Sequence, residues 1–184
     1  MKIRTVLMSV CACLLLGACT SVYVSSPLGD KPVVLDAGWA GVWLTDDGVM
    51  ESSLVDGEQG LLQLAAIETG PAGPSLETAV VTLREKDGVF YAHVRDDETE
   101  NLYHWAIVAR KSDRLIMAWY PEAKKFKSLI SENKFPGSFQ KPGDEHNDNV
   151  ILGELKPEHL EMINDPASGL IDWKNPAVMI RVSE

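Results

Sequence analysis

The chain has 184 residues, of which 45% are hydrophobic, and its 27 acidic side chains outnumber 17 basic ones, which gives a net charge of −10 at pH 7. An acidic surplus of this size repels nucleic acid and anionic lipid headgroups, and so disfavours a nucleic-acid-binding protein. The density of apolar residues from about Gly38 onward is sufficient for one packed core.

The first residues have the pattern of an export signal. Two basic residues precede an apolar run over residues 6–16, and two small residues then lead to a cysteine. The stretch Leu16-Gly17-Ala18-Cys19 resembles the signal of bacterial lipoproteins, in which the cysteine thiol accepts a diacylglyceryl group. The alternatives are a plain secretory signal and a membrane span, but the apolar run is shorter than the ~20 residues that cross a bilayer.

The resemblance implies that residues 1–18 are removed and that Cys19 carries the lipid, including palmitate, as a membrane anchor. Two basic residues leave with the signal, so 15 basic residues face 27 acidic ones and the charge becomes −12. Cys11 and Cys13 also leave, so no thiol pair remains for a disulfide. Thr20 stands where an inner-membrane retention signal would place Asp, which implies the outer membrane, with the domain facing the periplasm.

Residues 19–37 predict a flexible tether after the lipidated cysteine, because serine, proline and glycine are frequent and no periodicity is visible. A single domain is then expected over residues 38–184.

The sequence from Gly38 to Tyr120 is typical of antiparallel β structure. Three Asp-Gly pairs offer the residues that tight hairpins need, and the clearest is Asp87-Gly88. The predicted strands, including two later ones, are Val42–Leu44, Leu61–Ile67, Thr78–Glu85, Val89–Arg95, Leu102–Arg110, Leu115–Tyr120, Val150–Leu152 and Ala177–Val182.

Alternation assigns the faces of the hairpin around Asp87. The residues expected to point inward are Ala79, Val81, Leu83, Phe90, Ala92 and Val94. Other strands are apolar on both faces and need a cover. A helix over Pro121–Asn133, with an apolar stripe on one side, can provide it, and a second short helix begins at Pro157 and ends near Asn164. The predicted fold is therefore mainly β: a small antiparallel barrel or strongly curved sheet with two short helices.

The stretch Gly41-Val42-Trp43 resembles the Gly-x-Trp signature of lipocalins. In that family the motif begins the first strand of a small barrel, where glycine lets the backbone pass close and tryptophan plugs the end. An arginine of the last strand stacks on that tryptophan, and Arg181 is the residue placed to match. The alternative is that Trp39 and Trp43 are core residues of an unrelated β-domain.

The sequence offers little support for metal or catalytic chemistry. The four histidines, His93, His104, His146 and His159, are dispersed without the spacing of metal ligands. The polar loop Asp144–Asp148 fails the EF-hand pattern. Nucleophile elbows and phosphate-binding glycine loops are absent from the sequence. We therefore expect no enzyme, no metal and no cofactor.

Three functions are considered, and a non-catalytic binding module for a small apolar or amphipathic ligand ranks first. The residues expected to form its wall are Leu62, Leu64, Phe90, Val94, Met117 and Trp119. The second is an envelope interaction protein with a filled barrel, whose acidic surface binds a cationic protein. An enzyme ranks last. An apolar cavity would distinguish the first function from the second.

Overall fold

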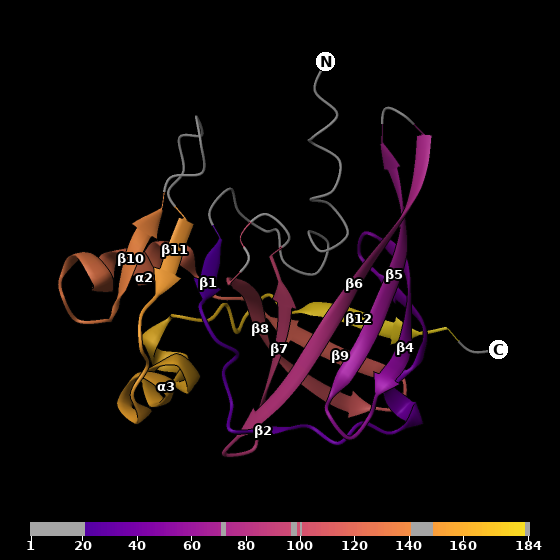
Figure 1. The fold of residues 1–184 in the computed structure, drawn as a ribbon, viewed down its shortest axis with the longest axis horizontal. Coiled ribbons are helices and arrows are strands. Elements are labelled where there is room, and N and C mark those ends of the chain that lie inside the picture. Colours follow the sequence, from indigo (N-terminus) through magenta and orange to yellow (C-terminus); the bar gives the residue numbers. More distant parts are fainter. Residues whose placement is uncertain (1–20, 71–72, 97–98, 100, 141–148, 183–184) are drawn as a thin grey trace.

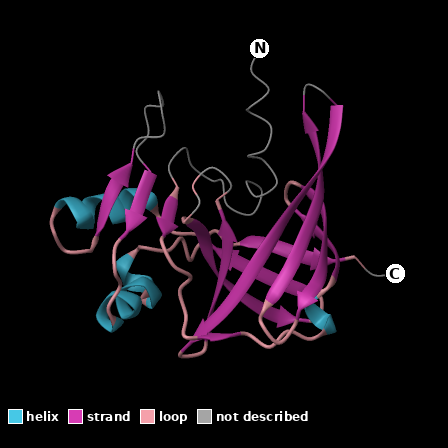
Figure 2. Ribbon diagram, viewed as in Figure 1, coloured by secondary structure: helices cyan, strands magenta, loops and turns pink. Residues whose placement is uncertain are grey.

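The computed structural model describes residues 21–70, 73–96, 99, 101–140 and 149–182. Cys19, residues 1–18, which are predicted to be a signal, and the loop Asp144–Asp148 lie outside these residues. The described chain is mainly β, with a closed eight-stranded antiparallel barrel and two α-helices. The helices lie together on one side of the barrel (Figures 1 and 2). The predicted fold class is confirmed, and of the two predicted forms, a barrel and a strongly curved sheet, the structure has the barrel.

Eight strands form the barrel. They are β3 (Gly41–Thr45), β4 (Gly48–Asp56), β5 (Leu61–Gly70), β6 (Gly73–Lys86), β7 (Val89–Arg95), β8 (Tyr103–Ser112), β9 (Leu115–Trp119) and β12 (Ala177–Arg181). The strands from β3 to β9 are neighbours in chain order, β12 lies between β9 and β3, and the pairing of β8 with β9 completes the circle. The predicted Asp87-Gly88 turn joins β6 to β7, with φ of 52° and 80° at its two residues, as a tight hairpin requires.

The remaining elements extend the sheet and cover one side of it. Strand β1 (Val22–Val24) pairs with β8, and β11 (Asn149–Leu152) and β10 (Gly137–Gln140) follow it outward. A short β2 (Lys31–Pro32) pairs with β6. The helical elements are α2 (Ala123–Ser131), α3 (Pro157–Asn164) and two 3₁₀ turns, η1 (Ala37–Trp39) and η2 (Pro166–Ser168).

Two apolar cores share the strands β7, β8 and β9. In β8, Ala106 and Val108 face the barrel interior, whereas Trp105 and Ile107 pack in the second core on the outer face. The second core also contains Phe126 from α2, which is fully buried. This arrangement explains why parts of these strands are apolar on both faces, and it confirms that a helix covers them. On α2 the buried residues are Ala123, Phe126 and Ile130, and Leu129 packs beside them at partial burial.

The segment predicted as a flexible tether, residues 19–37, is instead part of the fold wherever it is described. Strand β1 is buried throughout, and apolar side chains further along the segment are buried as well. These are Leu28, Val33 and Leu35. The prediction was wrong because it gave weight to the six serine, proline and glycine residues of the segment, whereas its seven aliphatic and aromatic residues, which have no regular spacing, decide the packing.

His93 fastens this segment to the barrel wall. Its Nε2 accepts a hydrogen bond of 2.8 Å from the Leu28 N–H, and its Nδ1 lies 3.3 Å from the Thr82 carbonyl oxygen. The ring is 1% exposed, and burial lowers the pKa of His93 from 6.5 to about 4. The structure therefore requires the neutral imidazole, because a proton on Nε2 would break the bond to Leu28.

This arrangement predicts acid-sensitive folding. Between pH 6.5 and 4, His93 is protonated in the unfolded chain but not in the folded chain. The contribution of the neutral His93 to the free energy of unfolding is therefore complete above pH 6.5 and is lost as the pH falls toward 4. The free energy of unfolding should fall by on the order of 3 kcal/mol over this range. Urea unfolding at pH 7.5 and pH 4.5 measures it. His93→Gln should reduce the pH dependence relative to the unaltered chain, and an equal pH dependence in both proteins would contradict the assignment.

Candidate ligand-binding cavity

The barrel encloses an apolar cavity of about 70 Å³. Leu62, Leu64, Val81 and Leu83 form part of its wall on β5 and β6, and Ile116 and Ala118 line it from β9. Trp39, Trp43 and Ser52 line it near the end at which β3 begins, which we call the base. Charged side chains are absent from the lining, so a ligand in the cavity would make mainly dispersion contacts and no ion pair.

Of the six residues predicted to form the wall, the structure brings three to the cavity. They are Leu62, Leu64 and Val94. Phe90 faces the barrel core and lies 6.5 Å from Trp39 between ring centroids, but it does not line the cavity.

Met117 and Trp119 were assigned to the wrong face. Both pack in the second core, and their neighbours Ile116 and Ala118 line the cavity instead. The error follows from β9 being apolar at every position, which leaves alternation without a signal.

The Gly41-Val42-Trp43 motif and Arg181 meet at the base. Trp43 is 1% exposed, and Arg181 is its register partner on β12, with the guanidinium carbon 5.5 Å from the centroid of the indole. The predicted contact between the two residues is therefore confirmed. Gly41 has φ of 142°, and a Cβ there would stand 2.8 Å from the Arg181 Nε. Glycine is needed at this position because the arginine occupies the space that a side chain would fill.

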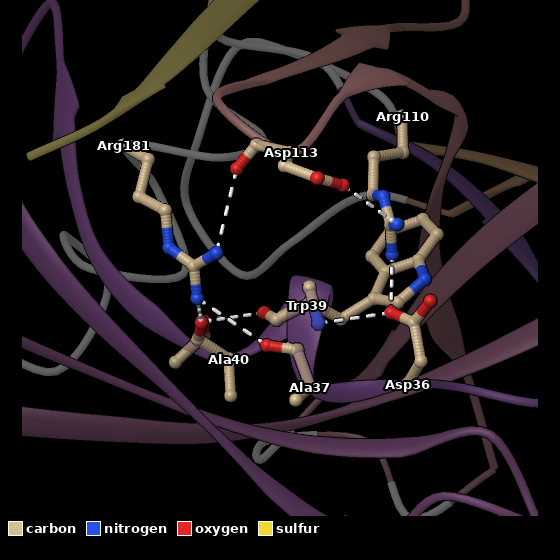
Figure 3. Close-up of polar contacts among 9 residues, drawn as sticks. Asp36, Ala37, Trp39, Ala40, Arg110, Asp113 and Arg181 are labelled. Carbon is tan, nitrogen blue, oxygen red and sulfur yellow. Dashed lines mark hydrogen bonds and ion pairs between the residues drawn. The ribbon is translucent and has the colours of Figure 1, made fainter. Parts of the chain in front are cut away.

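A single turn, Asp36 to Ala40, closes the base (Figure 3). The Asp36 carboxylate accepts a hydrogen bond of 2.9 Å from the Gly38 N–H and begins the turn. Arg181 donates to the carbonyl oxygens of Ala37 and Ala40. These bonds hold the carbonyl groups of a short 3₁₀ turn that β structure alone would leave without partners.

Ser52 joins the turn to the barrel from inside. Its hydroxyl accepts a hydrogen bond of 2.8 Å from the Trp43 Nε1–H and donates one of 2.7 Å to the Trp39 carbonyl oxygen. Strand β4, on which Ser52 lies, was not among the predicted strands, because polar residues at 51–53 interrupt its apolar pattern. The strand could have been recognised from Met50 and Ser52, which are two residues apart and both point inward, if a serine were allowed at a buried position.

A second arginine holds the turn from outside. The Arg110 guanidinium lies over the Trp39 ring, 5.9 Å from its centroid, and forms ion pairs with Asp36 and Asp113. The hydrogen bond from Arg110 lowers the pKa of the Asp36 carboxyl, and the same bond raises the pKa of Arg110. Because Asp36 is solvent-exposed, its ion pair with Arg110 adds little to stability directly, and its main effect is to hold Arg110 over Trp39.

The opposite end of the barrel carries smaller inward side chains. Ala66, Ala79 and Ala177 are half-buried and pack against the barrel core there, and Tyr120 lines the cavity at the end of β9. The interior is thus blocked by two tryptophans at the base, whereas small alanine side chains fill less of it at the other end. A ligand would enter from the alanine end.

The three histidines among the described residues lie at separate places. His93 faces Leu28, His104 lies 3.4 Å from the Asp96 carboxylate, and the His159 Nδ1 accepts a hydrogen bond from the Lys156 N–H at the start of α3. His146 is outside the described residues. Within the described part of the chain, groups of three or more side chains able to hold a metal ion are absent.

Comparison with protein-family models, with curated proteins and with solved structures found no match. Among the helices of the described residues, none has the length and apolar character needed to cross a bilayer. The cavity and the N-terminal sequence are therefore the two features of this chain that point to a function.

The base predicts a difference between two adjacent serines. Ser52→Ala would leave the Trp43 Nε1–H and the Trp39 carbonyl buried without a partner, which should lower the free energy of unfolding by about 2–4 kcal/mol. Ser53→Ala alters an exposed side chain on the opposite face of the same strand and should change the free energy of unfolding by less than about 0.5 kcal/mol. Urea unfolding at pH 7.5 compares the variants. Similar values for both would show that Ser52 does not hold the base.

Proposed function

We propose that this protein is an outer-membrane lipoprotein that faces the periplasm and whose barrel binds a small apolar or amphipathic molecule without catalysis. The observation that carries the proposal is the apolar cavity, blocked at the base by Trp39 and Trp43. A barrel filled by side chains would have favoured the alternative, an interaction protein that uses its acidic surface alone.

The volume of the cavity limits the size of the group that a ligand can place inside the barrel. An engineered cavity of about 150 Å³ accommodates benzene, so about 70 Å³ suits a slender group rather than a ring system. Met50 and Met179 line the cavity, and methionine side chains change rotamer easily. A single alkyl chain could enter by displacing them. The proposed ligand class is therefore a molecule with one unbranched apolar chain.

The N-terminal sequence supports the anchor. Strand β1 begins at Val22, only three residues after Cys19. Three extended residues span at most about 11 Å, so a lipid on Cys19 would keep the barrel next to the membrane. A membrane is also the nearest source of molecules with apolar chains.

The arrangement of Gly41, Trp43 and Arg181 supports a relationship to lipocalins. The interval between β9 and β12 departs from that family, because α2, α3 and the strands β10 and β11 stand between the seventh and eighth barrel strands. We propose a lipocalin-like barrel with this insertion.

Ligand binding is tested with a fluorescent fatty-acid probe and with native mass spectrometry of the protein from its own periplasm. Ala92 lines the cavity, and Ala92→Leu should weaken probe binding at least tenfold because it fills the space. Ala65→Leu is the matched control, since Ala65 lies on β5 outside the lining. An unaltered protein that shows neither a co-purifying ligand nor saturable probe binding would contradict the proposal.

The anchor is tested by fractionation of cells that produce the full chain with Cys19→Ala. The variant should leave the membrane fraction, because the lipid on Cys19 is the proposed attachment. Retention in the outer membrane after a high-salt wash would contradict the lipoprotein assignment.

A further inference from the structure

The beginning of helix α2 is rich in lysine. Three of its first five residues are Lys124, Lys125 and Lys127, and its first turn contains no acidic residue. Lysine is unfavourable there because the N-terminal end of a helix carries a partial positive charge. Among the described residues, none of the three forms an ion pair, whereas Lys134, beyond the helix, pairs with Glu132 at 2.6 Å. Helix stability therefore does not explain these lysines.

The three lysines lie on the side of α2 that faces away from the second core. The buried side of the helix is formed by Phe126 and Ile130, with Ala123 at its start. Lys124 and Lys125 are exposed and Lys127 is half-buried. We call these three lysines the lysine face. The face is positive on a chain whose net charge is −10.

The charges around the start of α2 leave this face positive. Two carboxylates lie there: Glu122 precedes the helix, and Asp172 belongs to a stretch that forms backbone hydrogen bonds with residues 120–122. Lys174 follows in the same stretch, so lysines still outnumber carboxylates at this place. The acidic helix α3 contacts Phe135, beyond the other end of α2.

The end of β9 and the beginning of β1 lie next to each other on one edge of β8. Trp119, the last residue of β9, pairs with Ile107, and Tyr23 of β1 pairs with His104. Three residues of β8, about 10 Å, separate these two pairings. Because β1 runs antiparallel to β8, Val22 is the end of β1 that is closer to Trp119. Helix α2 begins only four residues after Trp119, so it starts close to the beginning of β1.

The packing agrees with this placement. Val22 and Phe126 belong to the same core, and the Ser21 carbonyl accepts a hydrogen bond of 2.9 Å from the Val150 N–H on β11, which packs against α2. Cys19 precedes Ser21 by two residues, which span at most about 7 Å of extended chain. A lipid on Cys19 would therefore bring the lysine face within reach of the surrounding headgroups.

We propose that the lysine face binds the phosphate groups of anionic phospholipids in the membrane that holds Cys19. This proposal rests on the proposed lipid anchor and adds an orientation to it. Without residues 1–18 the chain has a charge of −12, so such a membrane repels most of its surface and attracts this face. Because β1 pairs with the first residues of β8, at the open end of the barrel, the orientation keeps that end near the membrane.

The full chain, purified with its lipid and reconstituted into vesicles, tests the orientation. A fluorescent thiol label on Ser128→Cys, an exposed position of α2, reports quenching by a phospholipid that carries a nitroxide on its headgroup. Ser53→Cys, exposed on β4, is the matched control. With phosphatidylglycerol in the vesicles, the α2 label should be quenched at least about threefold more strongly than the β4 label. In vesicles of phosphatidylcholine alone, its quenching should fall to near the β4 value.

Two pairs of substitutions separate the lysine face from the net charge. Lys124→Gln with Lys125→Gln should reduce the quenching at Ser128→Cys to the β4 value. Lys31→Gln with Lys86→Gln removes the same charge from β2 and β6 and should leave the quenching unchanged. Because Lys124 and Lys125 are exposed, their glutamine variant should keep the melting temperature of the unaltered chain, which checks the fold.

Each other outcome overturns the proposal. Equal quenching of the two labels would mean that no face is preferred. Strong quenching on α2 that does not depend on phosphatidylglycerol or on the lysines would mean that the tether alone sets the distance. The mass of the purified chain is measured first. A chain without diacylglyceryl on Cys19 would overturn the lipoprotein assignment as well, whereas a lipidated chain with equal quenching would overturn the orientation alone.

Discussion

The barrel depends on how its base is closed. An eight-stranded barrel must end somewhere, and here the end is a 3₁₀ turn, η1, that hydrogen bonding within the sheet does not stabilise. Two arginines hold it from outside, each lying over a tryptophan: Arg110 over Trp39 and Arg181 over Trp43. Ser52 holds it from inside. Cation–π contacts and charge-assisted bonds are each modest, but here they converge on one turn.

The closed base has consequences for the rest of the molecule. Because the second core packs on β7, β8 and β9 from outside, these strands are fixed on both faces. The Tyr91 hydroxyl, which donates to the Asn164 side chain at 2.9 Å, ties α3 to the same wall. Among the described residues, no second core covers the opposite wall, from β12 to β6, on its outer face.

Much of this fold could be predicted from local patterns. Alternation and Asp-Gly turns located most barrel strands, and the stripe around Phe126 located α2 and its buried face. The contact of Trp43 with Arg181 came from a family resemblance. The faces of β9 could not be predicted, because Met117 and Ala118 are both apolar and only the second core decides between them. The ion pair of Asp36 with Arg110 joins residues 74 positions apart, so no local sequence pattern predicts it.

The central claim is that the barrel is closed at the tryptophan end and receives an apolar chain from the other. A crystal structure with a medium-chain fatty acid that carries bromine at its methyl end tests this directly, since the bromine can be located by its anomalous scattering. We expect the bromine inside the barrel, above Trp39 and Trp43, with the Asp36–Ala40 turn in place. A bromine outside the barrel, or a chain that enters through a displaced turn, would contradict the account.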